Sequence, residues 1–104
     1  MDIPTAIQKL EYEWDDELGK GFFSRLRYDS FDDEGFQRVK DILKTVEIPS
    51  GTTIDRRFTE LTWFIPVFLD WQREAWVQDG KDSEVLDRAI KQISEALTTI
   101  LGLP

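Results

Sequence analysis

Cysteine and histidine are both absent from the 104-residue sequence, and these absences exclude much of the chemistry of small proteins. Without cysteine, neither a disulfide framework nor a thiolate metal site can form. Without histidine, the chain lacks the Ser-His-Asp arrangement, the commonest general base and the Glu-x-x-His elements of di-iron bundles. We therefore expect no metal and no other cofactor.

Two further kinds of site are excluded by spacing. The stretches GTTIDRR and LGKGFF lack the pattern of a phosphate-binding loop, and DSFDDEG and DGKDSE lack the alternating acids of a calcium loop. Carboxylates remain, as in glycoside hydrolysis, and the group that fits is Glu13, Asp16 and Glu17 beside Trp14. Because we expect these acids on an exposed helix face of a short chain, we predict that the protein is not an enzyme.

Long hydrophobic runs are also missing. The longest nearly apolar run, LTWFIPVFL at residues 61–69, has nine residues. A membrane-spanning helix needs about 20 such residues. The opening stretch MDIPTAIQKLEYEW has neither the basic region nor the continuous apolar region of a signal peptide. The sequence therefore predicts a cytoplasmic protein with no membrane partner.

Positive charge is scarce, because 13 Lys and Arg residues against 21 Asp and Glu residues give a net charge of −8. This charge repels phosphate backbones, so we expect no nucleic-acid partner, and a basic protein is the natural complement. The acids concentrate at residues 11–17 and 29–34. The first cluster falls in the later turns of a predicted helix, where the helix dipole disfavours acids. It is either a solvated surface or a face for a basic partner.

Apolar residues at steps of three and four run along nearly the whole chain, which predicts an all-α fold. We expect one domain, residues 1–104, built as a compact bundle of four long helices plus one short helix. The short helix is expected at 22–28, with Arg25 and Arg27 facing nearby acids. The first two long helices are expected at 4–18 and from a cap at Asp32 through Val46. The third is expected at 54–78, after a capping box of Thr52 and Asp55. The fourth is expected to run from a cap at Asp82 or Ser83 to a stop at Gly102 and Pro104.

The helix expected at 54–78 is apolar on nearly all sides, which predicts a central helix enclosed by neighbours. Pro66 lies in its middle. Proline cannot donate to the carbonyl of Thr62 and its ring crowds that turn, so we expect a kink at Pro66. The kink either lets the helix curve around the core or opens a groove beside Trp63 for a small molecule.

Two stretches have the composition of a protein-binding face. The end of the 54–78 helix offers tryptophan together with arginine, residue types that dominate binding energy at interfaces. The alternative interpretation of this stretch is that Asp70, Arg73 and Glu74 form a local ion-pair network and that the tryptophans simply pack against a neighbour. The first candidate face consists of Tyr12, Glu13, Trp14, Asp16 and Glu17, and the second consists of Trp71, Arg73 and Trp76.

The stretches GFFSRLR, LTWFIPVFLDWQRE and ILGLP resemble a family of small acidic bacterial proteins of uncharacterised function. That family is similar in size and charge to polymorphic-toxin immunity proteins. The resemblance implies a cytoplasmic protein that neutralises a basic toxin, and it transfers no binding residues. Our leading prediction is a non-enzymatic protein-binding domain, an immunity- or antitoxin-like inhibitor of a basic protein partner. The alternatives are a self-associating scaffold protein that forms a homodimer, and a small-molecule binder with a groove near Pro66.

Overall fold

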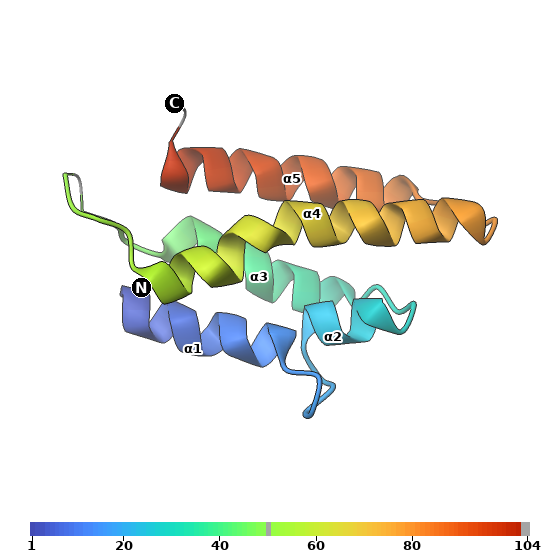
Figure 1. Cartoon of the computed structure of the whole chain (residues 1–104), viewed down its shortest axis with the longest axis horizontal. Coiled ribbons are helices and arrows are strands. Elements are labelled where there is room, and N and C mark those ends of the chain that lie inside the picture. The colour runs from blue at the N-terminus through green and yellow to red at the C-terminus, as the bar shows by residue number, and fades with distance from the viewer. Residues whose placement is uncertain (50, 103–104) are drawn as a thin grey trace. The chain divides into compact units, whose positions relative to one another are not determined.

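The computed structural model describes residues 1–49 and 51–102, and all regular structure in these ranges is α-helical, which confirms the all-α prediction (Figure 1). The chain divides into two compact units, Met1–Leu61 and Thr62–Pro104, and the longest helix runs from the first unit into the second. The prediction of a single domain stays a prediction. The helices are α1 (Ile3–Trp14), α2 (Phe22–Arg27), α3 (Asp33–Thr45), α4 (Arg56–Gln78) and α5 (Glu84–Leu101).

Helix α1 begins within one residue of its predicted start but ends early. The Asp2 carboxylate accepts the backbone N–H of Thr5 at 2.9 Å and caps the first turn. At the other end, the side chain of Asp15 accepts the N–H groups of Glu17 and Leu18, at 2.9 and 3.3 Å. Such local bonds compete with the helical ones. The predicted end at residue 18 is therefore wrong, and Leu18 is 52% exposed rather than packed.

An aromatic cluster around Phe22 forms much of the core of the first unit. The centroid of the Phe22 ring lies 5.2 Å from those of Phe23 and Phe31 and 5.5 Å from that of Phe36. Trp14 of α1 stacks on Phe23 with the centroids 3.9 Å apart. Aromatic pairs at these distances add to the free energy gained by burial. Because α2 has only 6 residues, this packing holds it in place more than helix propensity does.

The two arginines of α2 pair with acids, which confirms the prediction for them. Nη1 of Arg25 lies 3.4 Å from Oδ2 of Asp32, and Arg27 pairs with Asp16. Both pairs are partly exposed, so each adds at most about 1 kcal/mol to the free energy of unfolding. They join α2 to the segments that precede and follow it.

The first turns of α4 belong to the first unit and are tied to α1. The predicted capping box is wrong, because the hydroxyl of Thr52 donates within its own turn and Asp55 alone accepts an N–H of the first helical turn, at 3.0 Å. The helix therefore begins at Arg56. The indole Nε1 of Trp14 donates to the carbonyl oxygen of Leu61 at 3.0 Å, which joins α1 to α4.

The second unit is a hairpin made of the rest of α4 and all of α5 (Figure 1). Its turn is a Schellman motif: the N–H of Lys81 donates to the carbonyl of Trp76 at 2.8 Å, that of Gly80 donates to Val77 at 3.1 Å, and Gly80 has a φ of 77°. The predicted end of α4 before Asp79-Gly80 is confirmed. The buried apolar residues of this unit are Ile65, Phe68, Leu69, Trp76, Leu86, Ala89, Ile93 and Leu97.

Helix α5 has the termini that the sequence predicts. It begins after Ser83, and the Asp82 carboxylate accepts the N–H of Glu84 at 2.9 Å. At its end, Gly102 has a φ of 81° and donates its N–H to the carbonyl of Thr98 at 2.9 Å. The predicted stop at Pro104 lies outside the described residues.

Helix α4 is not enclosed on all sides. Trp63, Trp71 and Val77 are 56%, 57% and 53% exposed. Within the second unit, α5 is the helix that packs beside α4. A single neighbouring helix covers only one face of the helix it packs against. The prediction that neighbours enclose this helix is therefore wrong for the side that carries these residues.

Gly21, the residue before α2, is required by a close approach of two backbones. A Cβ atom here would lie 2.4 Å from both the Cα atom of Glu13 and the carbonyl oxygen of Tyr12. Because backbone atoms cannot move aside as a flexible side chain does, we expect Gly21→Ala to lower the free energy of unfolding by about 3 kcal/mol. Urea denaturation measures this, with Lys20→Ala at the exposed neighbouring position as control. Equal stability of the two variants would contradict the close approach.

Candidate functional site

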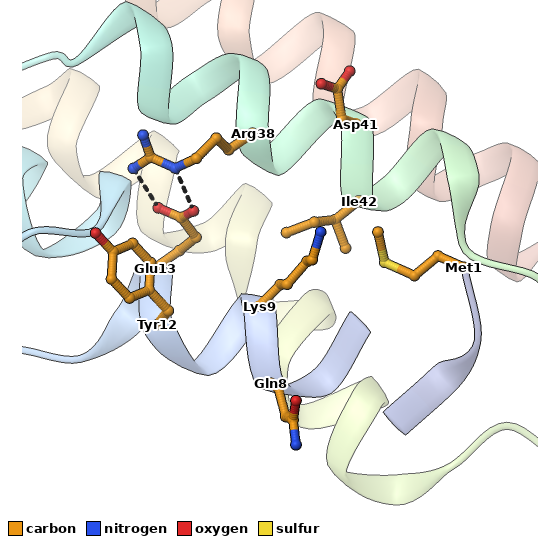
Figure 2. A pocket seen from close by; sticks show the side chains of 8 residues that line it. All are labelled: Met1, Gln8, Lys9, Tyr12, Glu13, Arg38, Asp41 and Ile42. Atoms are coloured by element: carbon orange, nitrogen blue, oxygen red, sulfur yellow. Dashed lines mark hydrogen bonds and ion pairs between the residues drawn. The ribbon is translucent and has the colours of Figure 1, made fainter. Parts of the chain in front are cut away.

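The acids at residues 11–17 do not form a single exposed surface. Glu13 is only 2% exposed, so the expectation of an exposed acid is wrong for this residue. Its carboxylate accepts from Nε and Nη2 of Arg38, at 2.9 and 3.0 Å (Figure 2), and from the backbone N–H of Phe22 at 2.8 Å. A side chain of α1 thus joins the start of α2 and the middle of α3. Glu13 therefore has a structural role, and its predicted role in partner binding stays a prediction.

The Glu13–Arg38 pair is firmly held and electrically neutral. Two parallel N–H···O bonds between a guanidinium and a carboxylate are strong and directional. The hydrogen bond to Glu13 raises the pKa of Arg38 above its ordinary value. The guanidinium carbon of Arg38 also lies 5.7 Å from the centroid of the Tyr12 ring, a cation–π distance. Because 42% of the Arg38 side chain is exposed, one side of the pair borders solvent.

A groove with a volume of about 360 Å³ lies beside this pair, between α1 and α3. Figure 2 shows the amine of Lys9 directed toward α3 near Ile42, with the Tyr12 ring beside the ion pair. The volume is near the lower end of the range for small-ligand sites. The groove predicted near Pro66 is a different feature and stays a prediction. The residues that line the observed groove are Met1, Gln8, Lys9, Tyr12, Glu13, Arg38, Asp41 and Ile42.

The other residues of the first predicted face do not line the groove. Trp14 is partly buried against Phe23, and Asp16 pairs with Arg27. The side chain of Glu17 is exposed. The structure therefore brings two of the five predicted residues together in the groove and leaves Asp16 and Glu17 as surface acids.

Of the second predicted face, Trp71 is the residue most open to solvent, at 57% exposed. Trp76 is only 8% exposed and belongs to the core, and its Nε1 has no hydrogen-bond partner among the residues that the structure describes. Nε of Arg73 donates to Asp87 of α5, and this bond raises the pKa of Arg73 above its ordinary value. The main partner of Arg73 is therefore on the other helix, and the acids near it on α4 have smaller effects.

Trp71 belongs to an aromatic surface that the sequence reasoning did not assemble. Phe64 lies between the two exposed tryptophans, with its ring centroid 5.4 Å from that of Trp63 and 5.3 Å from that of Trp71. Asp70 and Glu74 are exposed, and they lie within about 20° of Trp63 around the helix axis. We call this surface the aromatic face of α4, and define it as Trp63, Phe64, Val67, Asp70, Trp71 and Glu74.

The sequence did carry a signal for this face. Trp63, Val67 and Trp71 are four residues apart, so they form an apolar stripe on one side of the helix. A second stripe passes through Ile65 and Leu69, which the structure buries. The sequence shows both stripes, but it does not show which of them the other helices cover.

Comparison of the chain with protein-family models, with curated proteins and with solved structures finds no match. In residues 1–49 and 51–102, no three or more Asp and Glu side chains are grouped in a way that could hold a metal ion. None of the described helices combines the length and the hydropathy that crossing a membrane requires. The candidate sites are therefore defined by geometry and charge alone.

The variant Glu13→Gln tests the buried ion pair. The amide keeps the shape of the side chain but removes the charge that Arg38 faces. Because Arg38 retains contact with water, we expect the free energy of unfolding to fall by about 2 kcal/mol, less than for a fully buried pair. Glu17→Gln, which removes an exposed acid of the same segment, should change it by less than about 0.5 kcal/mol. Urea denaturation measures the free energy of unfolding of both variants. A decrease for Glu13→Gln no larger than that for Glu17→Gln would refute the structural role of Glu13.

Proposed function

We propose that this protein is a non-enzymatic protein-binding domain and that the aromatic face of α4 holds its partner. The observation that carries the proposal is the exposure of Trp63 and Trp71, each more than half open to solvent on the same helix. Contiguous exposed apolar surface marks interaction sites, and tryptophan is prominent among residues that dominate binding energy. The edge-on contacts with Phe64 orient both indole rings, so less side-chain entropy is lost on binding.

The charge of this face supports a basic partner. In the described part of the chain, no ion pair joins Asp70 or Glu74 to a cation. Arg73 pairs with Asp87 of α5, and the charges of Asp70 and Glu74 add only smaller contributions to its raised pKa. With a net charge of −8 on the chain, the long-range field also favours a basic protein and speeds its association.

The function we infer is that of an immunity- or antitoxin-like inhibitor, which covers the basic active surface of a toxin in the bacterial cytoplasm. The acidic composition and the resemblance in GFFSRLR and LTWFIPVFLDWQRE support this reading. The exposed acids Asp16 and Glu17, with Tyr12, remain a second candidate contact surface in the first unit. We also propose that α4 bends at Pro66, because the carbonyl of Thr62 has no N–H to accept at that turn. Such a bend would set the angle between Trp63 and Trp71.

Self-association through the same face is less well supported by its charge. A two-fold dimer places a surface against its own copy. Asp70 and Glu74 of both chains would then lie within one interface, and like charges that come close together at an interface cost several kcal/mol. A partner with Lys or Arg opposite these acids has no such cost.

The double variant Trp63→Ala/Trp71→Ala tests the proposed face. The partner, captured on the immobilised wild-type protein and then purified, should bind the variant at least about 100-fold more weakly, because two anchoring rings are lost. Tyr28→Ala, which removes an aromatic side chain that is 76% exposed in the first unit, is the matched control and should leave the dissociation constant unchanged. Surface plasmon resonance measures all three proteins, and unchanged affinity of the double variant would exclude the aromatic face as the binding surface.

The variant Asp70→Asn/Glu74→Gln tests the basic character of the partner. We expect the association rate constant to fall about tenfold at low ionic strength, with a smaller effect at high ionic strength, because the lost charges act through long-range attraction. Asp33→Asn/Glu34→Gln removes the same charge from exposed positions in the first turn of α3 and is the control. If both double variants slow association equally, net charge rather than this face attracts the partner.

A further inference from the structure

The groove between α1 and α3 is held at both of its ends. It lies within the first unit and shares no residue with the aromatic face of α4. At one end, the Glu13–Arg38 pair joins the two helices (Figure 2). At the other end, the backbone N–H of Glu47 donates to the carbonyl oxygen of Met1, and the Met1 amino group donates to that of Thr45, both at 2.8 Å. A hollow held in this way is preformed, so little free energy is spent on shaping it when a ligand binds.

Lys9 supplies the charge of the groove that remains open to a ligand. Its side chain extends from α1, and its ammonium is directed toward α3 (Figure 2). Within residues 1–49 and 51–102, Lys9 forms no ion pair. Of the two acids in the lining, Glu13 already accepts three hydrogen bonds, and the carboxylate of Asp41 is directed away from Lys9 (Figure 2). The groove therefore presents one uncompensated ammonium, which attracts an anionic group.

Three other lining residues offer apolar surface. The side chains of Met1 and of the buried Ile42 border the groove at the end away from the ion pair, and the Tyr12 ring, 39% exposed, borders it beside the pair. The volume of about 360 Å³ is near the lower end of the range for ligand sites, so the ligand that fits is small. Burial of its apolar part would supply affinity, and the charge contact would fix its orientation.

We propose that this groove binds a small, free carboxylic acid with an apolar body. The carboxylate pairs with Lys9, and the apolar body lies against Met1, Ile42 and Tyr12. The net charge of −8 opposes an anion at long range, but exposed charges more than about 8 Å away are largely screened at physiological ionic strength, and Lys9 is in direct contact. A cation is disfavoured, because Lys9 repels it. A nucleotide is disfavoured, because its several negative charges would meet a single uncompensated cation.

Titration with 3-phenylpropionate, followed by amide NMR of the whole chain with no residue added before Met1, tests this site. We expect shifts confined to residues of α1 and α3 around the groove, with a dissociation constant of about 0.1 to 1 mM, the range for so small a ligand. At matched pH and ionic strength, three probes should each bind at least about fivefold more weakly: 3-phenylpropanamide, which is uncharged, phenethylamine, which is cationic, and acetate, which has no apolar body. Equal binding of the amide or of acetate, or no shift at about 20 mM 3-phenylpropionate, would overturn the proposal.

The C-terminus of a protein chain presents the same carboxylate, so acetyl-Gly-Gly-Phe with a free C-terminus is titrated alongside. Because the groove is small, the peptide part of this probe extends beyond it, and we expect the peptide to bind no more tightly than 3-phenylpropionate. Tighter binding of the peptide would replace the free acid by a chain terminus as the ligand.

Substitutions on the two walls assign the contacts. Lys9→Met should weaken 3-phenylpropionate binding at least about fivefold, because it removes the charge contact and keeps a long side chain. Lys91→Met removes the same charge from an exposed position on α5 and is the matched control. Asp41→Asn should leave the dissociation constant unchanged within about twofold, because this carboxylate is directed away from Lys9 (Figure 2).

These three positions are exposed, so thermal unfolding should be unchanged in all the variants and a loss of binding reports on the groove itself. Wild-type affinity in Lys9→Met would contradict the assignment of the carboxylate to Lys9. An equal loss in Lys91→Met would show that net charge, rather than the groove, governs binding, and would also contradict it.

Discussion

A single buried carboxylate organises the first 61 residues. Glu13 accepts hydrogen bonds from the backbone of Phe22 and from the guanidinium of Arg38, so it fixes α1 against two other helices at once. The other close contacts follow from this placement. Gly21 can approach the backbone of Glu13 because it has no side chain, and that approach delivers Phe22 to the aromatic core. The same bonds hold α1 and α3 apart at the distance that leaves a groove between them.

The acidic residues of this chain fall into two groups, those that pair with arginines and those that do not. Several acids are structural, because they pair with arginines of other helices, as Glu11 does with Arg57 and Asp87 with Arg73. Partly exposed pairs of this kind contribute little individually, but they consume the scarce positive charge of the chain. Asp70 and Glu74, which form no such pair within residues 1–49 and 51–102, then set the local potential. The net charge of −8 therefore determines the long-range field of the molecule. The positions of the unpaired acids determine the local charge of each surface.

The helices could be predicted from the sequence because their signals are local. Apolar steps, turn glycines and the cap at Asp82 act within a few residues, and the hairpin of α4 and α5 follows from them. The role of Glu13 could not be predicted, because its main partner Arg38 is 25 positions away and no local pattern links them. The exposure of Trp63 was missed for a related reason. Helical spacing shows which residues share a face, but the number of helices available to cover that face is a property of the fold.

One ion pair connects the packing of the second unit with the chemistry of its exposed face. Arg73 is the cation nearest to Trp71 along the chain, and on a solvent-facing side it would neutralise Asp70 or Glu74. The bond to Asp87 directs it toward α5 instead. The contact that joins the two helices therefore also pairs Arg73 with Asp87 rather than with the acids of the aromatic face, whose effects on its pKa are smaller. Replacing Asp87 would release that arginine, so a residue of α5 outside the aromatic face would influence the charge of the surface that we propose for partner binding.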